Sequence, residues 1–201
     1  MVSSLEGAEP VRIVPLTPQY WDAVAGLFGE GGDPKTCWCM FWRLRSKDGS
    51  FANARELRDG FHRLVDEDRD PAPGLLALRG DRAVGWVSLG PREDFGRLVH
   101  SRVRPRLDDL DVWSIVCFVV SKTERGRGLM GELLEAAMGY AITHGAPGLE
   151  AYPVDPGDGR VPAALGYTGL LSTFEAAGFK VVREINSPQA TVRRVIVRRE
   201  A

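Results

Sequence analysis

The stretch that decides the fold is "FVVSKTERGRGLMGELLEAAMGYAITHG", residues Phe118 to Gly145. It continues a nearly uninterrupted apolar run, "VWSIVCFVV" at residues 112–120, which is typical of a strand covered on both faces. After a turn rich in glycine and arginine, apolar residues recur at helical spacing until Gly145, a natural helix stop. The stretch therefore predicts a buried strand, a tight turn and a helix.

The turn has the chemistry of an anion site. The start of a helix leaves several backbone N–H groups unpaired and carries a partial positive charge. Glycines let an anion approach the backbone, and arginines add charge and bidentate donors. Residues 125–130 could therefore cradle a phosphate or pyrophosphate, although an ordinary tight turn with exposed arginines fits the same residues.

Other phosphate-binding loops fit this turn poorly. No Gly-Lys-Ser/Thr is present, which excludes a P-loop. Gly126, Gly128 and Gly131 satisfy G-x-G-x-x-G, and Glu150 and Asp155 lie at roughly the distance of a ribose-binding acid. However, the strand lies late in the chain and no second half of a dinucleotide fold follows. A nicotinamide-dependent oxidoreductase therefore rests on the glycine pattern alone.

Around this stretch the chain alternates strands and helices. The expected order is strand, two helices, three strands, helix, strand, helix and two strands, which makes an α/β domain around a mixed sheet. Residues 1–10 are expected to be a flexible tail. The remaining elements are expected at residues 11–17, 17–29, 52–68, 75–78, 83–89, 148–154, 167–177, 179–185 and 191–198.

Composition excludes several classes of protein. The 201 residues carry a net charge of −1, with 44% hydrophobic and 26% charged residues, so nothing indicates a nucleic-acid or membrane partner. The N-terminus does not resemble a signal peptide, and no apolar run reaches the length of a membrane span. Three cysteines cannot make a disulfide framework, and Cys37 and Cys39 are too close together for a zinc pair. We expect a cytoplasmic protein without a metal.

The segment "VSKTERGRGLMGELLEAA" resembles motif A of the GNAT N-acetyltransferase superfamily, in which Arg/Gln-x-x-Gly-x-Gly/Ala opens a helix. Arg125, Gly126, Arg127 and Gly128 match it, and "FEAAGF" at residues 174–179 is similar to a later helix end of the family. The order of elements agrees over residues 11–198. The resemblance implies one domain at residues 11–201, a mixed, mostly antiparallel sheet of six to seven strands flanked by helices. "CWCMFWR", "GPREDF" and "VWSIVCFVV" together resemble an actinobacterial subgroup of that superfamily.

The resemblance implies an acetyl-CoA-dependent N-acetyltransferase. An unidentified, small-molecule amine would attack the acetyl group directly in a ternary complex. The pyrophosphate would bind the turn, the pantetheine arm would pair with the strand before it, and a backbone N–H near Phe118 or Val119 would stabilise the oxyanion. The implied cofactor-binding residues are Phe118, Val119, Val120, Arg125, Gly126, Arg127, Gly128, Leu129, Met130 and Phe174.

The sequence departs from the family pattern at four positions. Met130 occupies a small-residue position, where it could crowd the pyrophosphate or turn into the core. Phe174 replaces a tyrosine that commonly protonates the leaving thiolate, and Ser114 replaces a glutamate base. Tyr167, where asparagine is common, is the remaining candidate for a catalytic acid, or a tyrosine at the edge of the core. The candidate bases are Glu93, Asp94, Asp109 and Asp111.

Two further features bear on the acceptor and on partners. Trp38 and Trp42 could form an aromatic wall for the acceptor, or simply pack in the core. The basic runs at residues 101–106 and near the C-terminus could bind the 3′-phosphate of CoA or an acidic acceptor, or be solvated. Residues 192–197 could pair with a second chain as a dimer contact. Because the usual acid and base are replaced, a CoA-binding sensor without catalysis is the alternative function.

Overall fold

A computed structural model describes residues 9–30, 34–45, 53–157, 159, 161, 163–185 and 191–201. Most of the predicted tail, residues 1–8, lies outside the described residues. The sheet has eight strands: β1 (Val11–Pro15), β2 (Gly74–Arg79), β3 (Arg82–Pro91), β4 (Trp113–Val120), β5 (Gly148–Ala151), β6 (Val154–Asp155), β7 (Lys180–Ile185) and β8 (Arg193–Glu200).

The sheet is mixed and mostly antiparallel, as predicted. Its order is β1-β2-β3-β4-β5-β8-β6, with β7 on the other edge of β8, and only β4 and β5 pair in parallel. The strand count exceeds the predicted six to seven because the expected strand at residues 148–154 is split. Both of its parts, β5 and β6, pair with β8. Pro153 lies between them and has no N–H to donate to a ladder.

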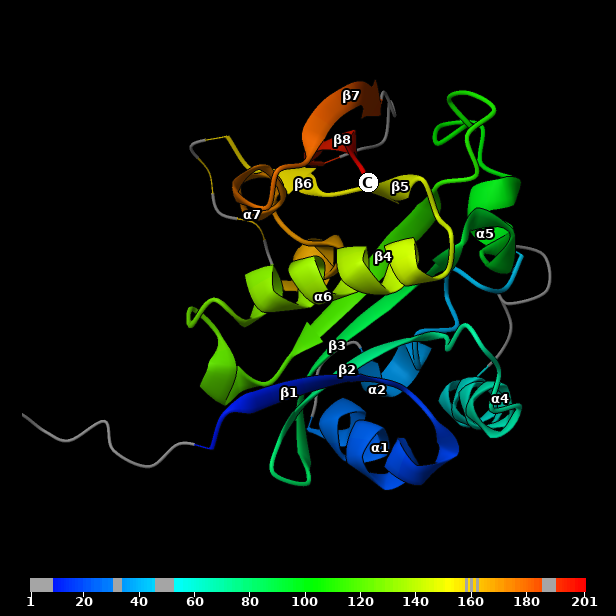
Figure 1. Ribbon diagram of the computed structural model, residues 1–201, viewed down its shortest axis with the longest axis vertical. Helices are drawn as coiled ribbons and strands as arrows, with labels where there is room; N and C mark the ends of the chain where they lie inside the picture. Colours follow the sequence, from blue (N-terminus) through cyan, green and yellow to red (C-terminus); the bar gives the residue numbers. More distant parts are fainter. Residues whose placement is uncertain are drawn as a thin grey trace, which may run out of the picture.

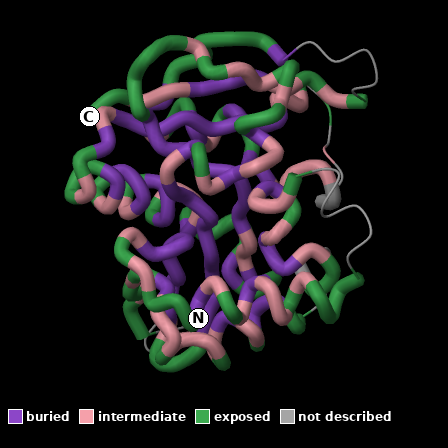
Figure 2. The backbone as a smooth tube through the Cα atoms, turned by 90° about the vertical axis from the view of Figure 1, so that its right-hand side faces the viewer, coloured by how far each residue is buried: buried purple, intermediate pink, exposed green. Residues whose placement is uncertain are grey.

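The helices cover the two faces of the sheet, and α6 lies across β3 and β4 (Figure 1). Buried side chains are concentrated between these layers (Figure 2). The α-helices are α1 (Trp21–Gly29), α2 (Pro34–Cys37), α4 (Ala54–Asp66), α5 (Gly96–Val99), α6 (Leu129–Thr143) and α7 (Leu171–Ala176). Short 3₁₀ helices are η1 (Pro18–Tyr20), η2 (Arg92–Asp94), η3 (Lys122–Glu124) and η4 (Ala163–Thr168).

Alternate residues of the central strands divide the core in two. Leu75, Ala77 and Val87 pack beneath α6 and α7, in what we call the α6 side. Leu76 and Trp86 point to the opposite side and pack against α1 and α4, which we call the α1 side. This period-two alternation is what a sheet covered on both faces requires.

Two helix boundaries differ from the expectation. Thr17 precedes η1 but its side chain caps nothing, and α1 begins only at Trp21. The second helix begins at a capping box that the sequence analysis missed, because Asn53 accepts from the Glu56 backbone N–H and the Glu56 side chain accepts from the Asn53 N–H.

The helix predicted at residues 167–177 is two elements, η4 and α7. Gly169 lies between them at φ 87°, a conformation that favours glycine. Its carbonyl accepts a hydrogen bond from Val154 N–H at 2.9 Å, which draws the chain toward β6. A side chain at Gly169 would also collide with the Met130 methyl group and the Phe174 ring. Tyr167 and Phe174 therefore do not share one helix.

Candidate cofactor site at an opening in the sheet

The sheet opens between β4 and β5. The two strands pair in parallel only at Trp113–Ile115, opposite Leu149–Ala151. Beyond that point β4 continues for five residues, Val116–Val120, which pair with β3 on one edge only. The β3 register also shifts between Ser88 and Leu89, so Val116 is an extra, bulged residue at the point where the opening begins. The unpaired edge of β4 can therefore accept an extended ligand as an added strand.

The turn after β4 presents backbone donors beside this opening. Gly126 and Gly128 have φ of 73° and 86°, and Gly128 immediately precedes the first residue of α6. Within the described chain, none of the N–H groups of residues 126–130 donates a hydrogen bond to a protein group. A Cβ built on Gly126, Gly128 or Gly131 would meet nothing within 4 Å. The turn therefore has the free donors and the open space that a pyrophosphate needs.

Buried contacts fix the turn in place. Glu124 is buried and accepts two hydrogen bonds from Arg79 of β2, at 3.3 Å from Nε and 2.9 Å from Nη2. Leu129 packs so closely over Gly85 that a Cβ there would lie 3.0 Å from the leucine. No local sequence pattern predicts either anchor, because Arg79 and Gly85 are distant in sequence from the residues that they contact. Preorganised donors cost less to order when a ligand binds.

The arginines of the turn are not equivalent. Arg125 Nε donates to the Val120 carbonyl at 3.3 Å, which ties the turn to the end of β4. Arg127 is exposed, and its side chain makes no hydrogen bond or ion pair with the described part of the chain. Of the two, Arg127 is therefore the free cation beside the donors of residues 126–130.

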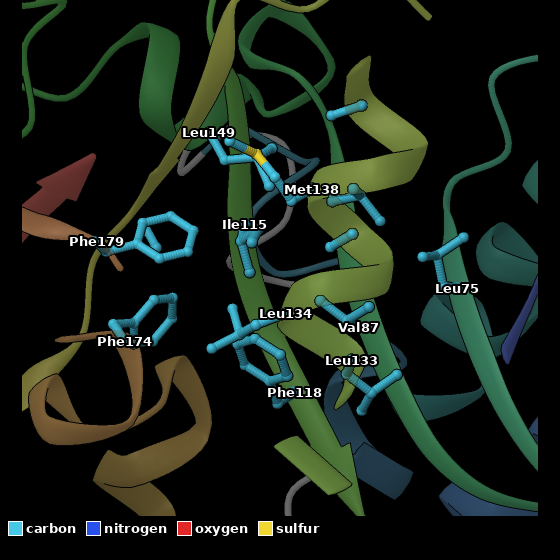
Figure 3. Close-up of a cluster of buried hydrophobic side chains, with 14 of the residues drawn as sticks. Leu75, Val87, Ile115, Phe118, Leu133, Leu134, Met138, Leu149, Phe174 and Phe179 are labelled. Carbon is cyan, nitrogen blue, oxygen red and sulfur yellow. The ribbon is translucent and has the colours of Figure 1, made fainter. Parts of the chain in front are cut away.

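Met130 turns into the core instead of crowding the turn. Its side chain packs with the α6-side cluster, and its methyl group lies beside Gly169 and Phe174. Phe174 is fully buried, and its ring centroid lies 6.0 Å from that of Phe118 and 5.2 Å from that of Phe179. Figure 3 shows Phe118 of β4 and Phe174 pointing into the same apolar layer beside α6. Phe174 thus supports Phe118 and cannot donate a proton.

Tyr167 lies on the opposite side of the sheet from α6. Its ring packs with the α1-side cluster, and η4 contacts β4. Burial raises the pKa of Tyr167, and the nearby charges of Arg194 and Arg104 work against that rise. A phenol with a raised pKa keeps its proton at neutral pH, as a general acid must.

Trp42 and Trp38 have different environments. Trp42 is buried and stacks on Tyr152 with ring centroids 6.4 Å apart, and the Arg104 guanidinium lies 5.2 Å from its ring centroid. Trp38 instead packs among Trp21 and Phe28 in the α1-side core. The structure therefore brings Trp42, but not Trp38, together with Tyr152 and Arg104.

A buried hydrogen-bond network holds Tyr152. Its hydroxyl accepts from Arg92 Nη1 at 2.8 Å and lies 3.1 Å from Ser114 Oγ. Burial is the largest of several effects on Tyr152, and it raises the pKa of this residue. Ser114, which stands where related enzymes carry a glutamate, thus positions a tyrosine. No local sequence pattern predicts this network, because its members lie on β4, η2 and the β5–β6 junction.

Arginines engage most of the carboxylates proposed as bases or as ribose ligands. Asp94 pairs with Arg43 and Arg69, while Glu93 and Asp111 flank Arg106 at 3.6 and 2.6 Å. Glu150 is buried and pairs with Arg198, and Asp155 pairs with Arg193. Neither Glu150 nor Asp155 is therefore free to bind a ribose, which weakens the dinucleotide alternative.

Cys39 and Cys117 lie in a buried, apolar environment on the α1 side. Cys39 Sγ accepts from Trp86 Nε1 at 3.1 Å and lies 3.8 Å from Cys117 Sγ of β4. Burial raises the pKa of Cys39, which disfavours a thiolate nucleophile. Trp38 and Cys39 have φ of 45° and 51°, an uncommon backbone conformation for residues other than glycine. In the described part of the chain, no three His, Cys, Asp or Glu side chains are placed to share a metal.

Two surface hollows lie away from the opening. One, of about 340 Å³, lies between Arg43 and α5, and the other, of about 330 Å³, lies between Met40 and α4. Neither is lined by residues of β4 or of the turn. The candidate site is therefore defined by its unpaired backbone. Among the described helices, none is both long and apolar enough to cross a membrane.

Known proteins match this architecture. Solved structures with similar folds include an acetyltransferase of the GNAT family from Streptococcus pneumoniae, with 15% identity, a TM-score of 0.55, and coverage of 96% of this chain and 100% of that one. Drosophila melanogaster polyamine N-acetyltransferase has 12% identity and a TM-score of 0.59, with coverage of 96% and 100%. Arabidopsis thaliana NAA60 in complex with acetyl-CoA has 11% identity and a TM-score of 0.52, also with coverage of 96% and 100%.

At these identities the structures show the fold alone, and no protein of curated function matches the chain in sequence. The family model described as "Acetyltransferase (GNAT) family" matches residues 38–163, more than half of the 201 residues. That range includes β4, the turn and α6. The resemblance of residues 37–43 to an actinobacterial subgroup stays a prediction. The chain belongs to the GNAT family of acetyltransferases.

Proposed function

We propose that the protein is an acetyl-CoA-dependent N-acetyltransferase that acts on a small-molecule amine. The observation that carries the proposal is the unpaired edge of β4 at Val116–Val120, which leads directly to the free N–H groups of residues 126–130. An extended pantetheine arm followed by a pyrophosphate fits this arrangement of a strand edge and an anion cradle. Arabidopsis NAA60, which shares the fold, is in complex with acetyl-CoA.

In this proposal the chain binds and orients the two substrates. Acetyl-CoA supplies an activated acetyl group with a good leaving thiol. The turn holds the pyrophosphate, β4 pairs with the pantetheine, and a backbone N–H near Phe118 or Val119 stabilises the oxygen that becomes negative. Tyr167, on the other side of the sheet, is the proposed proton donor to the leaving thiolate.

The α6 side and the α1 side thus have separate roles. The turn at the start of α6 and the layer of Phe118 and Phe174 belong to the α6 side. Trp42, Tyr152 and Tyr167 belong to the α1 side, where we place the acceptor. The opening in the sheet between them is where the acetyl group would pass from one substrate to the other, which requires both to be held in register.

The first test is a thermal shift with acetyl-CoA, CoA and NADH, each in large excess. A ligand at about 100 times its Kd adds roughly 2.7 kcal/mol of stability, which corresponds to a rise in Tm of several degrees for a protein of this size. We expect a shift with acetyl-CoA and CoA and none with NADH. No shift with either CoA species contradicts the proposal. A shift without transfer to any amine supports the alternative, a CoA-binding protein that lacks catalysis.

Two matched variants locate the binding site. Gly131→Glu places a carboxylate in the first turn of α6, where a side chain has open space and the backbone needs no positive φ. Gly139→Glu makes the same change eight residues later on an exposed part of the same helix. Both should fold, since Glu favours a helix more than Gly. We expect Gly131→Glu to abolish the shift with CoA by repelling the pyrophosphate, and Gly139→Glu to preserve it. Equal affinities would refute the placement of the site.

A further inference from the structure

Most arginines that are shielded from solvent in this protein have a carboxylate partner. Ion pairs within 4.0 Å engage the side chains of Arg43, Arg69, Arg79, Arg198 and Arg199. Such pairing is expected, because a partly buried charge without a partner is costly. Within the described chain, Arg92, which is buried, also lacks a carboxylate partner, but its hydrogen bonds go to the Tyr152 hydroxyl and to the Leu98 and Arg104 carbonyls. The informative case is therefore a shielded guanidinium that has no carboxylate and leaves a donor unpaired.

Arg104 and Arg194 are half-buried and have no carboxylate partner among the described residues. Arg194 donates from Nη1 to Thr168 Oγ1 at 2.8 Å and from Nη2 to the Leu165 carbonyl at 3.0 Å, so only neutral groups receive its hydrogen bonds. Arg104 lies over the Trp42 ring, and its Nε is shielded from solvent without any hydrogen-bond partner. Unpartnered buried donors are rare in folded proteins and point to a missing acceptor.

The charges of Arg104 and Arg194 interact with each other. Burial lowers the pKa of Arg104, and the charge of Arg194 lowers it further. Burial also lowers the pKa of Arg194. Tyr167 interacts electrostatically with both guanidinium groups. Two like charges that repel each other in partly buried positions are stabilised when an anion interacts with both.

The position of Arg104 is fixed by the core. The backbone carbonyl of Arg104 accepts a hydrogen bond from Arg92 Nη2, and Arg92 also donates to Tyr152 and to the Leu98 carbonyl. The backbone N–H of Arg104 donates to Ser101 Oγ at 3.1 Å. The loop that carries Arg104 is thus tied to the same tyrosine on which Trp42 stacks. The backbone at Arg104 is therefore held in place, and its guanidinium lies against Trp42.

The arginines lie on the acceptor side of the opening. Along β8, Val195 and Val197 face the α6 side, whereas Ile196 faces the α1 side, and Arg194 shares the face of Ile196. The pyrophosphate turn belongs to the opposite, α6 side. The pair is therefore badly placed for the 3′-phosphate of CoA and well placed for the second substrate, beside Tyr167.

We propose that Arg104 and Arg194, with the face of Trp42 beside them, bind an acidic group of the acceptor, so that the substrate is a small amine that also carries a carboxylate or a phosphate. This inference rests on the proposed transferase function and names its substrate class. The guanidinium groups can donate to two acceptor oxygens in a charge-assisted manner. The acid would orient the free amine toward the opening at β4.

The experiment compares acceptors that differ only in their acid. Amino acids of graded length are paired with their carboxamides, and O-phosphoethanolamine is paired with ethanolamine. Release of CoA from acetyl-CoA is followed with the full-length protein. We expect at least about a tenfold higher kcat/KM for the acidic member of the preferred pair, in line with a lost charged hydrogen bond. The amino-acid and phosphate arms distinguish a carboxylate from a phosphate.

Variants test whether the preference for acidic acceptors comes from Arg104 and Arg194. Arg104→Gln and Arg194→Gln should raise the KM of the acidic acceptor about 10- to 100-fold while the KM of acetyl-CoA is retained, and Arg104→Gln should reduce the kcat/KM of the acidic acceptor much more than that of its neutral partner. Arg104→Lys keeps the charge and should recover part of the loss. The controls are exposed neighbours, Arg102→Gln in the same loop and Arg193→Gln on the same strand. Because Arg194 also supports η4, Arg104→Gln is the decisive variant.

The possible outcomes distinguish failure of the proposed acidic acceptor from failure of the proposed transferase function. Equal or better transfer to the neutral members, or an equal loss for both members in Arg104→Gln, overturns the inference. If acetyl-CoA raises the Tm but no acidic amine is acetylated or competes, the inference fails and the cofactor site stands. If acetyl-CoA produces no shift, the proposed function fails and this inference fails with it.

Discussion

Single residues decide which groups can do chemistry at the opening. Phe174 occupies the place of a common proton donor but is buried against Phe118 and has no hydroxyl. Tyr167 does have one, on the acceptor side, and burial raises its pKa. Ser114 positions Tyr152 through a hydroxyl–hydroxyl contact of 3.1 Å. The proposed proton donor and the proposed acceptor wall thus come from residues that the family pattern does not supply.

Tyr167→Phe tests the proposed acid. It removes only the hydroxyl, so the fold and the KM of acetyl-CoA should be retained, and kcat should fall about 10²- to 10⁴-fold if proton donation limits the reaction. Because burial raises the pKa of Tyr167, the wild-type kcat should not decline through loss of this proton until the pH exceeds about 10. Tyr20→Phe is the control, because the Tyr20 hydroxyl accepts a hydrogen bond from Arg12 of β1. An unchanged kcat in Tyr167→Phe would remove it from catalysis.

At the scale of elements, the central motif was predictable and its surroundings were not. Residues 112–145 form the strand, turn and helix that their apolar pattern predicts, since hydrophobic spacing alone determines these elements. The helix predicted at residues 167–177 breaks at Gly169, because pairing with Val154 and contact with Met130 override local helical spacing. The position of Trp38 in the core and of Trp42 beside Arg104 also depends on long-range packing that no local pattern encodes.

The opening between β4 and β5 should be visible in hydrogen exchange. The N–H groups of Val116–Val120 that face away from β3, and those of residues 126–130, have no strand partner and should exchange quickly in the free protein. Saturating acetyl-CoA should slow exchange in both segments. Trp113–Ile115, which is paired on both edges, serves as the internal reference. Protection confined to other parts of the chain would mean that the ligand binds elsewhere.

At the scale of the whole molecule, distant segments hold the ends of α6. Arg79 of β2 anchors the turn before the helix through Glu124. At the other end, His144 Nδ1 lies 2.8 Å from the Tyr140 carbonyl and Nε2 lies 2.7 Å from Asp70 Oδ1. Both ring nitrogens therefore face acceptors, which favours the protonated imidazole. The hydrogen bond to the Tyr140 carbonyl is the largest effect and raises the pKa of His144 above 6.5. Asp70 raises the pKa further.

This arrangement predicts a pH dependence of global stability. Because the folded pKa of His144 is raised, its contribution is fully present below pH 6.5 and is lost as the pH rises through the folded value. The free energy of unfolding should thus decline over this interval, by less than about 1 kcal/mol because the pair is partly exposed. Urea unfolding of Asp70→Asn should show a flatter profile, and Asp59→Asn, at a partly exposed carboxylate on α4, should match the wild type. A profile of Asp70→Asn as steep as that of the wild type would contradict this account.

The interrupted pairing of β4 also bears on self-association. An apolar strand with a free edge normally recruits strands from other molecules, and proteins protect the outer edges of their sheets with charge. Here the outer strand β7 carries Lys180, Arg183 and Glu184, all exposed, whereas the free edge of Val116–Val120 lies inside the sheet, with η4 beside it. The interior position shields this edge from the strands of other molecules. The segment that would hold the cofactor is therefore also the one that would nucleate aggregation if β5–β8 came away from β4.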